Sequence, residues 1–331
     1  MQMGYGSIKI GLYQHTTIKK GGGIVDIFES RKINPMLIAE MREPFDSPDF
    51  IYEIKWDGIR CVSYLDTETD IRNKRNKMMT PIYPELENLH KQIKTKCILD
   101  HELLVLKNGL PDFYEVQKRA LMTNPFKIKL AAERYPASII AYDILYYNDK
   151  DITMLPLIER KKYLQDVVIE NEMISVSRYV ENNGIMLFDL VKEKGLEGIV
   201  AKKKKSLYWQ GKRSKDWIKC KIMNTDDCII CGYIIKEKSM TSLILGQYDN
   251  DVLVYKGHVT LGVSLRVLNE HSYEVIDNSP FGFVPARNEN AVWLAPELVC
   301  IVESMPTEKG GFRQPVFKGI REDKTAIECQ V

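Results

Sequence analysis

The chain has 331 residues, a formal net charge of +2 at pH 7, and a composition of 44% hydrophobic and 28% charged residues. This composition is that of a soluble globular protein, and the length allows two domains with separate cores. No apolar run reaches the length of about 18 residues that crosses a bilayer, and the N-terminus lacks a secretory signal pattern. We therefore expect a cytoplasmic protein with no membrane partner.

The seven cysteines form an odd set without the spacing of a disulfide framework, so we expect reduced thiols. Cys228 and Cys231 have the spacing of a zinc-binding pair, but no second pair follows at a suitable distance. The apolar residues between and around them favour a buried strand.

The N-terminal part of the chain is Gly-rich and weakly patterned, and we expect a variable or poorly ordered arm over residues 1–32. The pattern then sharpens, and Pro84 in a first-turn position predicts a helix that continues to Ile93. Further helices are predicted over 156–170 and 184–194. Alternating apolar positions predict strands over 50–56, 61–65, 70–75, 97–106, 138–147, 198–202 and 216–223.

The pattern changes near Asn224, after which strand-like segments dominate. They cover 228–235, 242–248, 251–257 and 297–304. A mostly β unit over residues 224–331 fits a small barrel, with one helix-like stretch at 264–271.

A basic segment runs from Lys202 to Lys221 and contains nine basic residues against one acid, Asp216. Three aromatic residues interleave with these charges, which favours an interaction with phosphate or nucleic acid. A solvated face is the alternative interpretation for the run at 203–205.

A possible nucleophile lies in the string Lys55-x-Asp57-Gly58-x-Arg60, which is weak evidence by itself. At an ordinary pKa of about 10.4, roughly one lysine in 2,500 is neutral at pH 7, so a catalytic lysine needs cationic or metal neighbours. Arg60 and the basic segment are candidates for that positive field.

Several other charged residues accompany predicted strands. Asp100 and Glu102 lie two residues apart, so their side chains point to the same face of a strand. Lys219 and Lys221 also share a face, and they repel each other unless an anion such as phosphate lies between them. Near the C-terminus, the string from Arg321 to Lys324 looks by itself like a charged surface turn.

These strings occur in the order of motifs I, III, IIIa, IV, V and VI of the covalent nucleotidyltransferases. The motifs are Lys55-x-Asp57-Gly58-x-Arg60, Asp100-x-Glu102, Ala141-Tyr142-Asp143, Glu197-Gly198-Ile199-Val200-x-Lys202, Trp217-x-Lys219-x-Lys221 and Arg321-x-Asp323-Lys324. Longer strings narrow the resemblance: Pro35-Met-Leu-Ile-Ala39, Glu43-Pro-Phe-Asp46, Tyr83-Pro-Glu-Leu86 and Arg313-Gln-Pro-Val-Phe-Lys-Gly319. From Pro35 to its end, the sequence resembles the ligase module of bacterial non-homologous end-joining DNA ligases.

The resemblance implies an α+β fold with two domains. A nucleotidyltransferase (ATP-grasp-like adenylation) domain of antiparallel sheets flanked by helices would cover residues 33–223, and an OB-fold β-barrel would cover 224–331. It also implies an ATP-dependent DNA ligase that seals 5′-phosphate/3′-hydroxyl nicks or breaks in duplex DNA through AMP bound covalently to Lys55.

The resemblance further implies roles for individual residues. Glu102 would hold the ribose or help at the metal site, and Glu197 would contribute to that site for Mg²⁺, with Mn²⁺ as an alternative. Tyr142 would stack on adenine. Lys219 and Lys221 would grip the α-phosphate, while Arg321, Asp323 and Lys324 would swing in to orient pyrophosphate. The remaining expected site residues are Glu53, Ile54, Asp57, Arg60 and Arg75.

Two positions depart from the family pattern. His101 replaces a glycine between the two acids, which is tolerable unless the backbone there needs a positive φ. Motif Ia appears as Arg72-Asn-Lys74-Arg75-Asn76, and we favour Arg75 over Lys74 as its phosphate ligand because a guanidinium matches phosphate geometry.

Partners and alternatives follow from the same resemblance. We expect a bacterial or archaeal, nucleoid-associated monomer that acts on nicked or broken DNA, with Ku and separate polymerase and phosphoesterase proteins as possible partners. The alternatives are an RNA ligase, an mRNA-capping guanylyltransferase, and a non-catalytic nucleic-acid-binding OB-fold protein.

Overall fold

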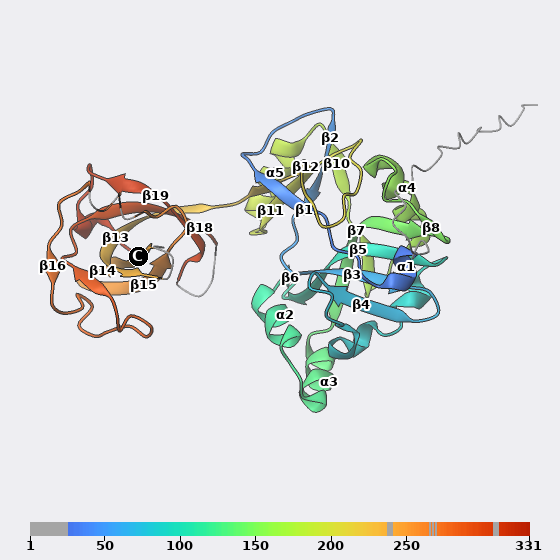
Figure 1. The fold of residues 1–331 in the computed structure, drawn as a ribbon, viewed down its shortest axis with the longest axis horizontal. Helices are drawn as coiled ribbons and strands as arrows, with labels where there is room; N and C mark the ends of the chain where they lie inside the picture. The colour runs from blue at the N-terminus through green and yellow to red at the C-terminus, as the bar shows by residue number, and fades with distance from the viewer. Residues whose placement is uncertain (1–25, 237–240, 265, 267, 269, 307–310) are drawn as a thin grey trace, which may run out of the picture.

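The structure is a computed structural model that describes residues 26–236, 241–264, 266, 268, 270–306 and 311–331 (Figure 1). The described residues form two lobes: an N-terminal lobe of two sheets with helices, and a C-terminal lobe built on one sheet. Strand β12 (Arg213–Lys221) ends the first lobe and β13 (Asn224–Ile235) begins the second, so the connection between them is short.

The first sheet of the N-terminal lobe has five strands in the order β1-β12-β11-β2-β10. β11 lies antiparallel between β2 and β12, and β1 pairs with β12 in parallel. Helix α5 (Gly184–Glu193) covers one face, where Val191 is buried with Tyr52 and Ile218. The other strands are β1 (Leu37–Met41), β2 (Phe50–Ile54), β10 (Tyr179–Glu181) and β11 (Gly198–Lys203).

The second sheet has seven strands: the path β4-β3-β5-β7-β8, with β6 on β5 and β9 on β7. One face packs on the five-stranded sheet, where Val62 and Ile98 share a cluster with Trp217. The other face is covered by helices, among them α2 through Val116 and α4 through Leu164. The strands are β3 (Ile59–Leu65), β4 (Thr69–Asn73), β5 (Cys97–Lys107), β6 (Leu110–Pro111), β7 (Ala137–Tyr147), β8 (Lys150–Asp151) and β9 (Ile174–Val176), and the helices are α2 (Phe113–Ala120), α3 (Pro125–Arg134) and α4 (Leu157–Val167).

The helix predicted from Pro84 to Ile93 is wrong. The chain instead makes two 3₁₀ turns there, η2 (Pro84–Leu86) and η3 (Leu89–Gln92), after a further turn, η1 (Thr80–Ile82). Leu86 and Leu89 are both fully buried and three residues apart, which matches the three-residue period of a 3₁₀ turn. Pro84 also disfavours an α conformation at the residue before it.

The boundary placed at residue 32 for the N-terminal arm is also too late. Residues Ile27–Ser30 form the short helix α1, which Asp26 caps by accepting a hydrogen bond from the Phe28 N–H at 2.6 Å. The Phe28 ring is 2% exposed and packs between Tyr64 and Tyr146. The sequence pattern of this segment is weak, so the helix was not predicted; its position depends on tertiary contacts. The rest of the predicted arm, 1–25, lies outside the described residues.

The C-terminal lobe is one seven-stranded sheet, with the path β15-β14-β13-β17-β16 and with β18 joining β13 to β19. A parallel bridge between Leu261 and Val316 links the segment after β15 to β19 and helps to close the curved sheet. Cys228 and Cys300 lie opposite each other on β13 and β18 in its core, and Cys228 and Cys231 lie in a buried strand, as predicted. All seven cysteines of the chain are buried and free. The strands are β14 (Thr241–Asp249), β15 (Val252–Val259), β16 (Val275–Ile276), β17 (Val292–Leu294), β18 (Val299–Met305) and β19 (Arg313–Arg321), followed by the 3₁₀ turn η5 (Ala326–Glu328).

The predicted strands are present, with ends that differ by a few residues. The helix predicted over 264–271 includes residues 265, 267 and 269, which lie outside the described residues, so it stays a prediction. Within the described parts of the chain, no helix has both the length and the apolar character to span a bilayer.

Candidate active site

Lys55 lies one residue beyond the end of β2, at the seam between the two sheets of the N-terminal lobe. Its backbone N–H donates to the Gly198 carbonyl at 2.8 Å, which fixes the start of the loop. Gly58 then passes close to β5: a Cβ atom there would lie 2.3 Å from the Leu103 carbonyl oxygen. A glycine after Asp57 is therefore required by the close approach of two backbones.

The Lys55 ammonium is held by a carboxylate from a distant strand. Its Nζ donates to Glu197 Oε2 at 2.5 Å, and Lys221 Nζ lies 3.0 Å from Glu197 Oε1. Gly198 sets this arrangement, because its φ is +142° and a Cβ would lie 2.2 Å from the Cys220 carbonyl oxygen. Strands β11 and β12 can thus approach closely enough for one carboxylate to bridge two lysines.

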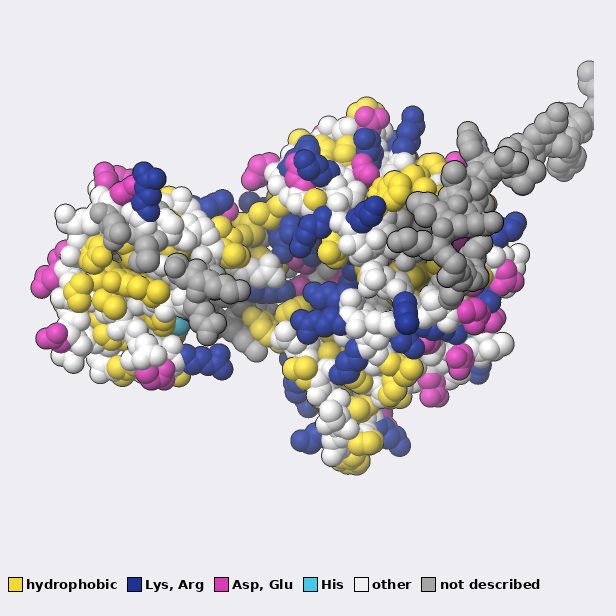
Figure 2. Space-filling model, in the orientation of Figure 1, with side chains coloured by type: hydrophobic (Ala, Val, Ile, Leu, Met, Phe, Trp, Pro, Cys, Tyr) yellow, Lys and Arg dark blue, Asp and Glu magenta, His cyan; other side chains and the backbone are white. Residues whose placement is uncertain are grey.

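Lys219 adds a third cation beside this bridge. It lies two residues before Lys221 on β12, and burial together with the charges of Lys221 and Lys55 lowers the pKa of its amine. Three lysines, Lys55, Lys219 and Lys221, thus lie near the single carboxylate of Glu197. An anionic group such as a phosphate would be stabilised here. Figure 2 shows Lys and Arg side chains gathered where the two lobes face one another.

Glu102 contributes a carboxyl group to the same region from β5. Burial raises the pKa of Glu102 to about 8, and the nearby charges of Lys55 and Arg60 only partly oppose this effect. A carboxyl group in this state gains from any additional positive charge placed beside it.

Arg60 is engaged in an ion pair with a second buried acid. Its Nε and Nη2 donate to the Asp100 carboxylate at 3.0 and 2.5 Å, and its Nη1 donates to the Met36 carbonyl at 2.7 Å. The Tyr208 hydroxyl also donates to Asp100, at 2.6 Å. Arg60 therefore orders the strands around the site. Because Asp100 balances the charge of Arg60, Arg60 supplies little of the positive field expected around Lys55.

Tyr142 lies on β7 with its ring near two cations. The Arg60 Cζ is 5.7 Å and the Lys202 Nζ 4.5 Å from the ring centroid, and Trp217 packs edge-on at 6.4 Å. Lys202 is buried, and this lowers the pKa of its amine to about 8 although Glu53 opposes the shift. The ring is thus fixed in position, as a stacking platform would need to be.

Glu53, an expected nucleotide ligand, is occupied by protein groups. Its side chain is almost fully buried and forms ion pairs with Lys161 and, at 3.1 Å, with Lys202. Burial would raise the pKa of Glu53, but the two lysines hold it below its ordinary value. Its neighbour Ile54 ends β2 and pairs with Ile199. Glu53 thus holds Lys202, the lysine whose ammonium lies over the Tyr142 ring.

His101, which replaces the family glycine, is accommodated as predicted. It is not among the residues with positive φ, and its side chain is fully buried with Nε2 2.7 Å from Ser63 Oγ. Burial lowers the pKa of this imidazole to about 4, so the ring is neutral at pH 7.

The motif VI residues are not brought to Lys55. Arg321 donates to Asp227 on β13 at 2.9 Å and to Asp323 at 2.6 Å, and Lys324 donates to Asp227 at 2.6 Å. Arg321 and its neighbours hold the pKa of Asp323 down at about 2. The three residues predicted to act on the nucleotide therefore gather around an acid of their own lobe.

The group that the C-terminal lobe does place in the site is Arg313, to which the sequence assigned no role. Its Nη1 and Nη2 donate to the two Asp57 carboxylate oxygens at 2.5 and 2.7 Å. Lys221 donates to the neighbouring Gln314 at 3.1 Å and lies 3.2 Å from Met305 Sδ. The ends of β18 and β19 thus reach the nucleotidyltransferase residues directly. Only the string Arg313-Gln-Pro-Val-Phe-Lys-Gly319 indicated this region.

Lys74 and Arg75 occupy an exposed turn after β4. The Asn73 side chain accepts hydrogen bonds from the backbone N–H groups of Arg75 and Lys77, and Asn76 has a φ of 60°. Both candidate cations face solvent, so the choice between them stays a prediction.

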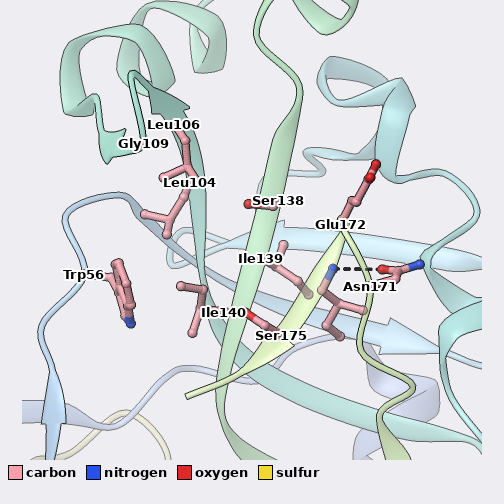
Figure 3. A pocket seen from close by; sticks show the side chains of 11 residues that line it. Trp56, Leu104, Leu106, Gly109, Ser138, Ile139, Ile140, Asn171, Glu172 and Ser175 are labelled. Atoms are coloured by element: carbon pink, nitrogen blue, oxygen red, sulfur yellow. Dashed lines mark hydrogen bonds between the residues drawn. The ribbon is translucent and has the colours of Figure 1, made fainter. Parts of the chain in front are cut away.

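A pocket lies beside Trp56, the residue that follows Lys55 in motif I. Trp56 forms one wall, and Leu104, Ile140 and Ser175 lie across from it (Figure 3). Its volume is about 250 Å³. Across the described ranges, no group of three or more His, Cys, Asp or Glu side chains could hold a metal ion unaided.

Comparison with known proteins shows the family of the chain. A family model for the ATP-dependent DNA ligase domain matches residues 35–221, and one for the C-terminal region of these ligases matches residues 236–324. The chain belongs to the ATP-dependent DNA ligase family. Its fold is accordingly a nucleotidyltransferase domain followed by an OB-fold domain.

Two curated ligases illustrate the relationship. The multifunctional non-homologous end joining protein LigD of Mycolicibacterium smegmatis is 30% identical over 311 residues, covering 89% of this chain but 39% of that protein. DNA ligase C of Mycobacterium tuberculosis is 29% identical over 342 aligned positions, covering 90% of this chain and 92% of that protein. The ligase chain thus spans about two fifths of the length of its LigD relative and nearly all of ligase C.

Among solved structures, a mycobacterial DNA ligase D complexed with ATP and MES superposes with a TM-score of 0.54 at 25% sequence identity. The match covers 90% of this chain and 98% of that one. Both lobes of the ligase are therefore included in the structural match.

Proposed function

We propose that this ligase seals 5′-phosphate/3′-hydroxyl nicks in duplex DNA through an AMP carried on Lys55. The observation that supports this most strongly is the Lys55–Glu197–Lys221 bridge, with Lys219 beside it. In this proposal the same side chains supply one amine nucleophile, one proton acceptor and two further cations at the seam of the two sheets. Such a set fits transfer of a nucleotidyl group, where most of the work is electrostatic positioning.

In the first step, Lys55 Nζ attacks the α-phosphorus of ATP. The new P–N bond forms as the bond to the pyrophosphate oxygen breaks, and pyrophosphate leaves with the bonding electron pair. The amine must lose its proton to attack, and Glu197, at 2.5 Å, is the acceptor in reach. Lys219 and Lys221 stabilise the charge on the phosphate oxygens.

The two later steps use the same residues. An oxygen of the 5′-phosphate at the nick displaces Lys55 from AMP, giving a DNA-adenylate and returning the amine. The 3′-hydroxyl then releases its proton and attacks the 5′-phosphorus. The phosphodiester bond forms as the phosphoanhydride bond to AMP breaks, and AMP leaves with the bonding electron pair. Each step moves charge among phosphate oxygens, so one cluster of cations serves all three.

A divalent cation fits this site. The buried Glu102 carboxyl, whose pKa is raised to about 8, gains from added positive charge, and Mg²⁺ prefers carboxylate oxygens. We assign Glu102 and Glu197 to hold Mg²⁺, with Mn²⁺ as an alternative. When bound, the ion supplies neutralisation of phosphate charge.

We infer that the C-terminal lobe takes two positions. The present one, with Arg313 on Asp57, suits the steps on DNA, since the motif VI residues face Asp227. A rotation would bring Arg321, Asp323 and Lys324 to the pyrophosphate in the first step. Tyr142 stacks on adenine in both positions.

The biological role is proposed from the LigD relative, which is named for end joining. Broken as well as nicked duplex DNA are the proposed substrates, with Ku and separate end-processing enzymes as partners. Ligation of linear DNA with and without Ku tests this role: stimulation by Ku supports it, and equal rates contradict it.

The proposed activity is tested by labelling and by substrate choice. With α-labelled ATP we expect a labelled protein, and with α-labelled GTP none. Sealing of a nicked DNA duplex but not of a matched RNA nick separates the proposal from an RNA ligase. Labelling by GTP would indicate a capping-type enzyme instead.

A further inference from the structure

Phe113, the first residue of α2, lies against the arginine that joins the two lobes. The Arg313 Cζ is 4.3 Å from the centroid of the Phe113 ring, within the range of a cation–π contact. The same guanidinium binds both oxygens of Asp57. The N-terminal lobe therefore offers Arg313 two different surfaces: a carboxylate at the edge of the guanidinium and an aromatic ring beside it.

Phe113 is held by a helix that is firmly fixed to the core. Asp112 caps α2 by accepting a hydrogen bond from the Glu115 N–H at 2.9 Å. One turn further on, Val116 is fully buried and its carbonyl accepts a hydrogen bond from Tyr83 Oη at 3.1 Å. The backbone that carries the Phe113 ring is therefore fixed to the core of the N-terminal lobe.

The far end of α2 is anchored equally well. Arg119 is fully buried, donates to the Tyr135 carbonyl at 2.8 Å, and lies 2.7 Å from Glu85. An eight-residue helix with both ends fixed in this way is a rigid support.

We propose that Phe113 is a positioning residue for nick sealing, acting through Arg313. The ring limits rotation of the guanidinium, so that its two terminal nitrogens stay aligned with Asp57 and the C-terminal lobe stays in register with Lys55 and Lys221. The inference rests on the proposed function and deepens it, because it assigns Phe113 to the DNA steps and not to reaction with ATP. The residues that we assign to reaction with ATP are Arg321, Asp323 and Lys324, and Arg313 is not one of them.

The test compares Phe113→Leu with Phe113→Trp in two separate assays. One measures adenylation of the enzyme by ATP, and the other measures sealing of nicked DNA by enzyme that already carries AMP. For Phe113→Leu we expect sealing to slow by about tenfold, and adenylation to change much less, since a cation–π contact at a partly buried site is worth about one decade. Phe113→Trp should restore sealing, because it restores an aromatic face.

The matched control is Leu121→Ala, which removes an apolar side chain that is 76% exposed at the other end of the same helix. It should leave both assays unchanged. Arg313→Lys provides an independent test, because it keeps a positive charge near Asp57 but loses the flat guanidinium. It should slow sealing as much as Phe113→Leu, and the double variant should be no slower than either single one.

The inference is overturned if Phe113→Leu leaves sealing unchanged, if it slows both assays equally, or if Trp fails to rescue it. Independent, multiplying effects of Phe113→Leu and Arg313→Lys would overturn it as well. Failure of the proposed function is distinguishable, because the unaltered enzyme would then either not be adenylated by ATP or not seal nicked DNA.

Discussion

The two terminal nitrogens of Arg313 bind the two carboxylate oxygens of Asp57 across the boundary between the lobes, at 2.5 and 2.7 Å. Asp57 belongs to the string that holds the nucleophile, two residues from Lys55, whereas Arg313 begins β19 of the C-terminal lobe. A bidentate ion pair thus links the C-terminal lobe directly to the loop that carries Lys55. A bidentate pair constrains orientation as well as distance.

Removal of this pair should separate the steps of the reaction. We expect Arg313→Ala to slow sealing of nicked DNA by pre-adenylated enzyme by about 100-fold, since loss of a partly buried charge-assisted pair costs roughly 2–4 kcal/mol. Single-turnover rates measure this. Lys318→Ala, on the same strand but paired with Glu303 at the surface, is the control. A fall of the same size in enzyme adenylation would contradict the assignment.

Variants of motif VI should behave in the opposite way. We expect Arg321→Ala to slow adenylation by ATP by about 100-fold, since a positioned cation at a leaving group contributes roughly 2–4 kcal/mol. Sealing by pre-adenylated enzyme should change much less, because Arg321 binds Asp227 when Arg313 occupies the site. Step-resolved assays of Arg321→Ala beside Arg313→Ala give the comparison. If both variants slow adenylation and sealing by the same factors, the proposal of two positions for the C-terminal lobe is contradicted.

Much of this site could be predicted from the sequence because its residues lie on regular strands. Lys219 and Lys221 were expected on one face of a strand, and both lie beside Glu197. A two-residue spacing is enough to place such side chains. The order of the motifs then indicated that distant strands meet.

The contacts of Glu53 and Arg313 could not be predicted in the same way. Glu53 follows the strand pattern, but whether it faces a ligand or two buried lysines depends on helix α4, which supplies Lys161. Arg313 pairs with a residue in another domain, so no periodicity of the sequence relates the two. The helix predicted from Pro84 was wrong for a local reason: a proline followed by leucines three residues apart is a pattern shared by the first turn of an α-helix and by 3₁₀ turns.

The raised pKa of Glu102 predicts a pH dependence of stability. A carboxyl group that binds its proton more tightly in the folded protein stabilises the fold below its unfolded pKa, and this contribution is lost as pH rises towards the folded value of about 8. Without ATP and metal, the unaltered enzyme should therefore lose more stability between pH 5 and 8 than Glu102→Gln. Thermal unfolding of both proteins across this range tests the sign. Glu87→Gln, at an exposed position, should follow the unaltered enzyme.

His101 predicts the opposite slope at lower pH. Its pKa is lowered to about 4 by burial, so the unfolded chain takes up a proton before the folded one does, and stability is lost as pH falls from about 6.5 towards 4. His101→Gly would restore the family residue but leave a cavity and the Ser63 hydroxyl unpaired. We expect it to lower the free energy of unfolding by about 2–4 kcal/mol at pH 7, as measured by denaturant titration. A stabilised glycine variant would contradict this account of the site.

The most direct test of the central claim is mass spectrometry of the intact protein before and after incubation with ATP and Mg²⁺, with the modified peptide mapped. We predict a gain of one AMP per chain, located on Lys55, that is removed by pyrophosphate or by nicked DNA and is absent from Lys55→Ala. An adduct on another residue, or one that persists in Lys55→Ala, would contradict the assignment of Lys55 as the nucleophile.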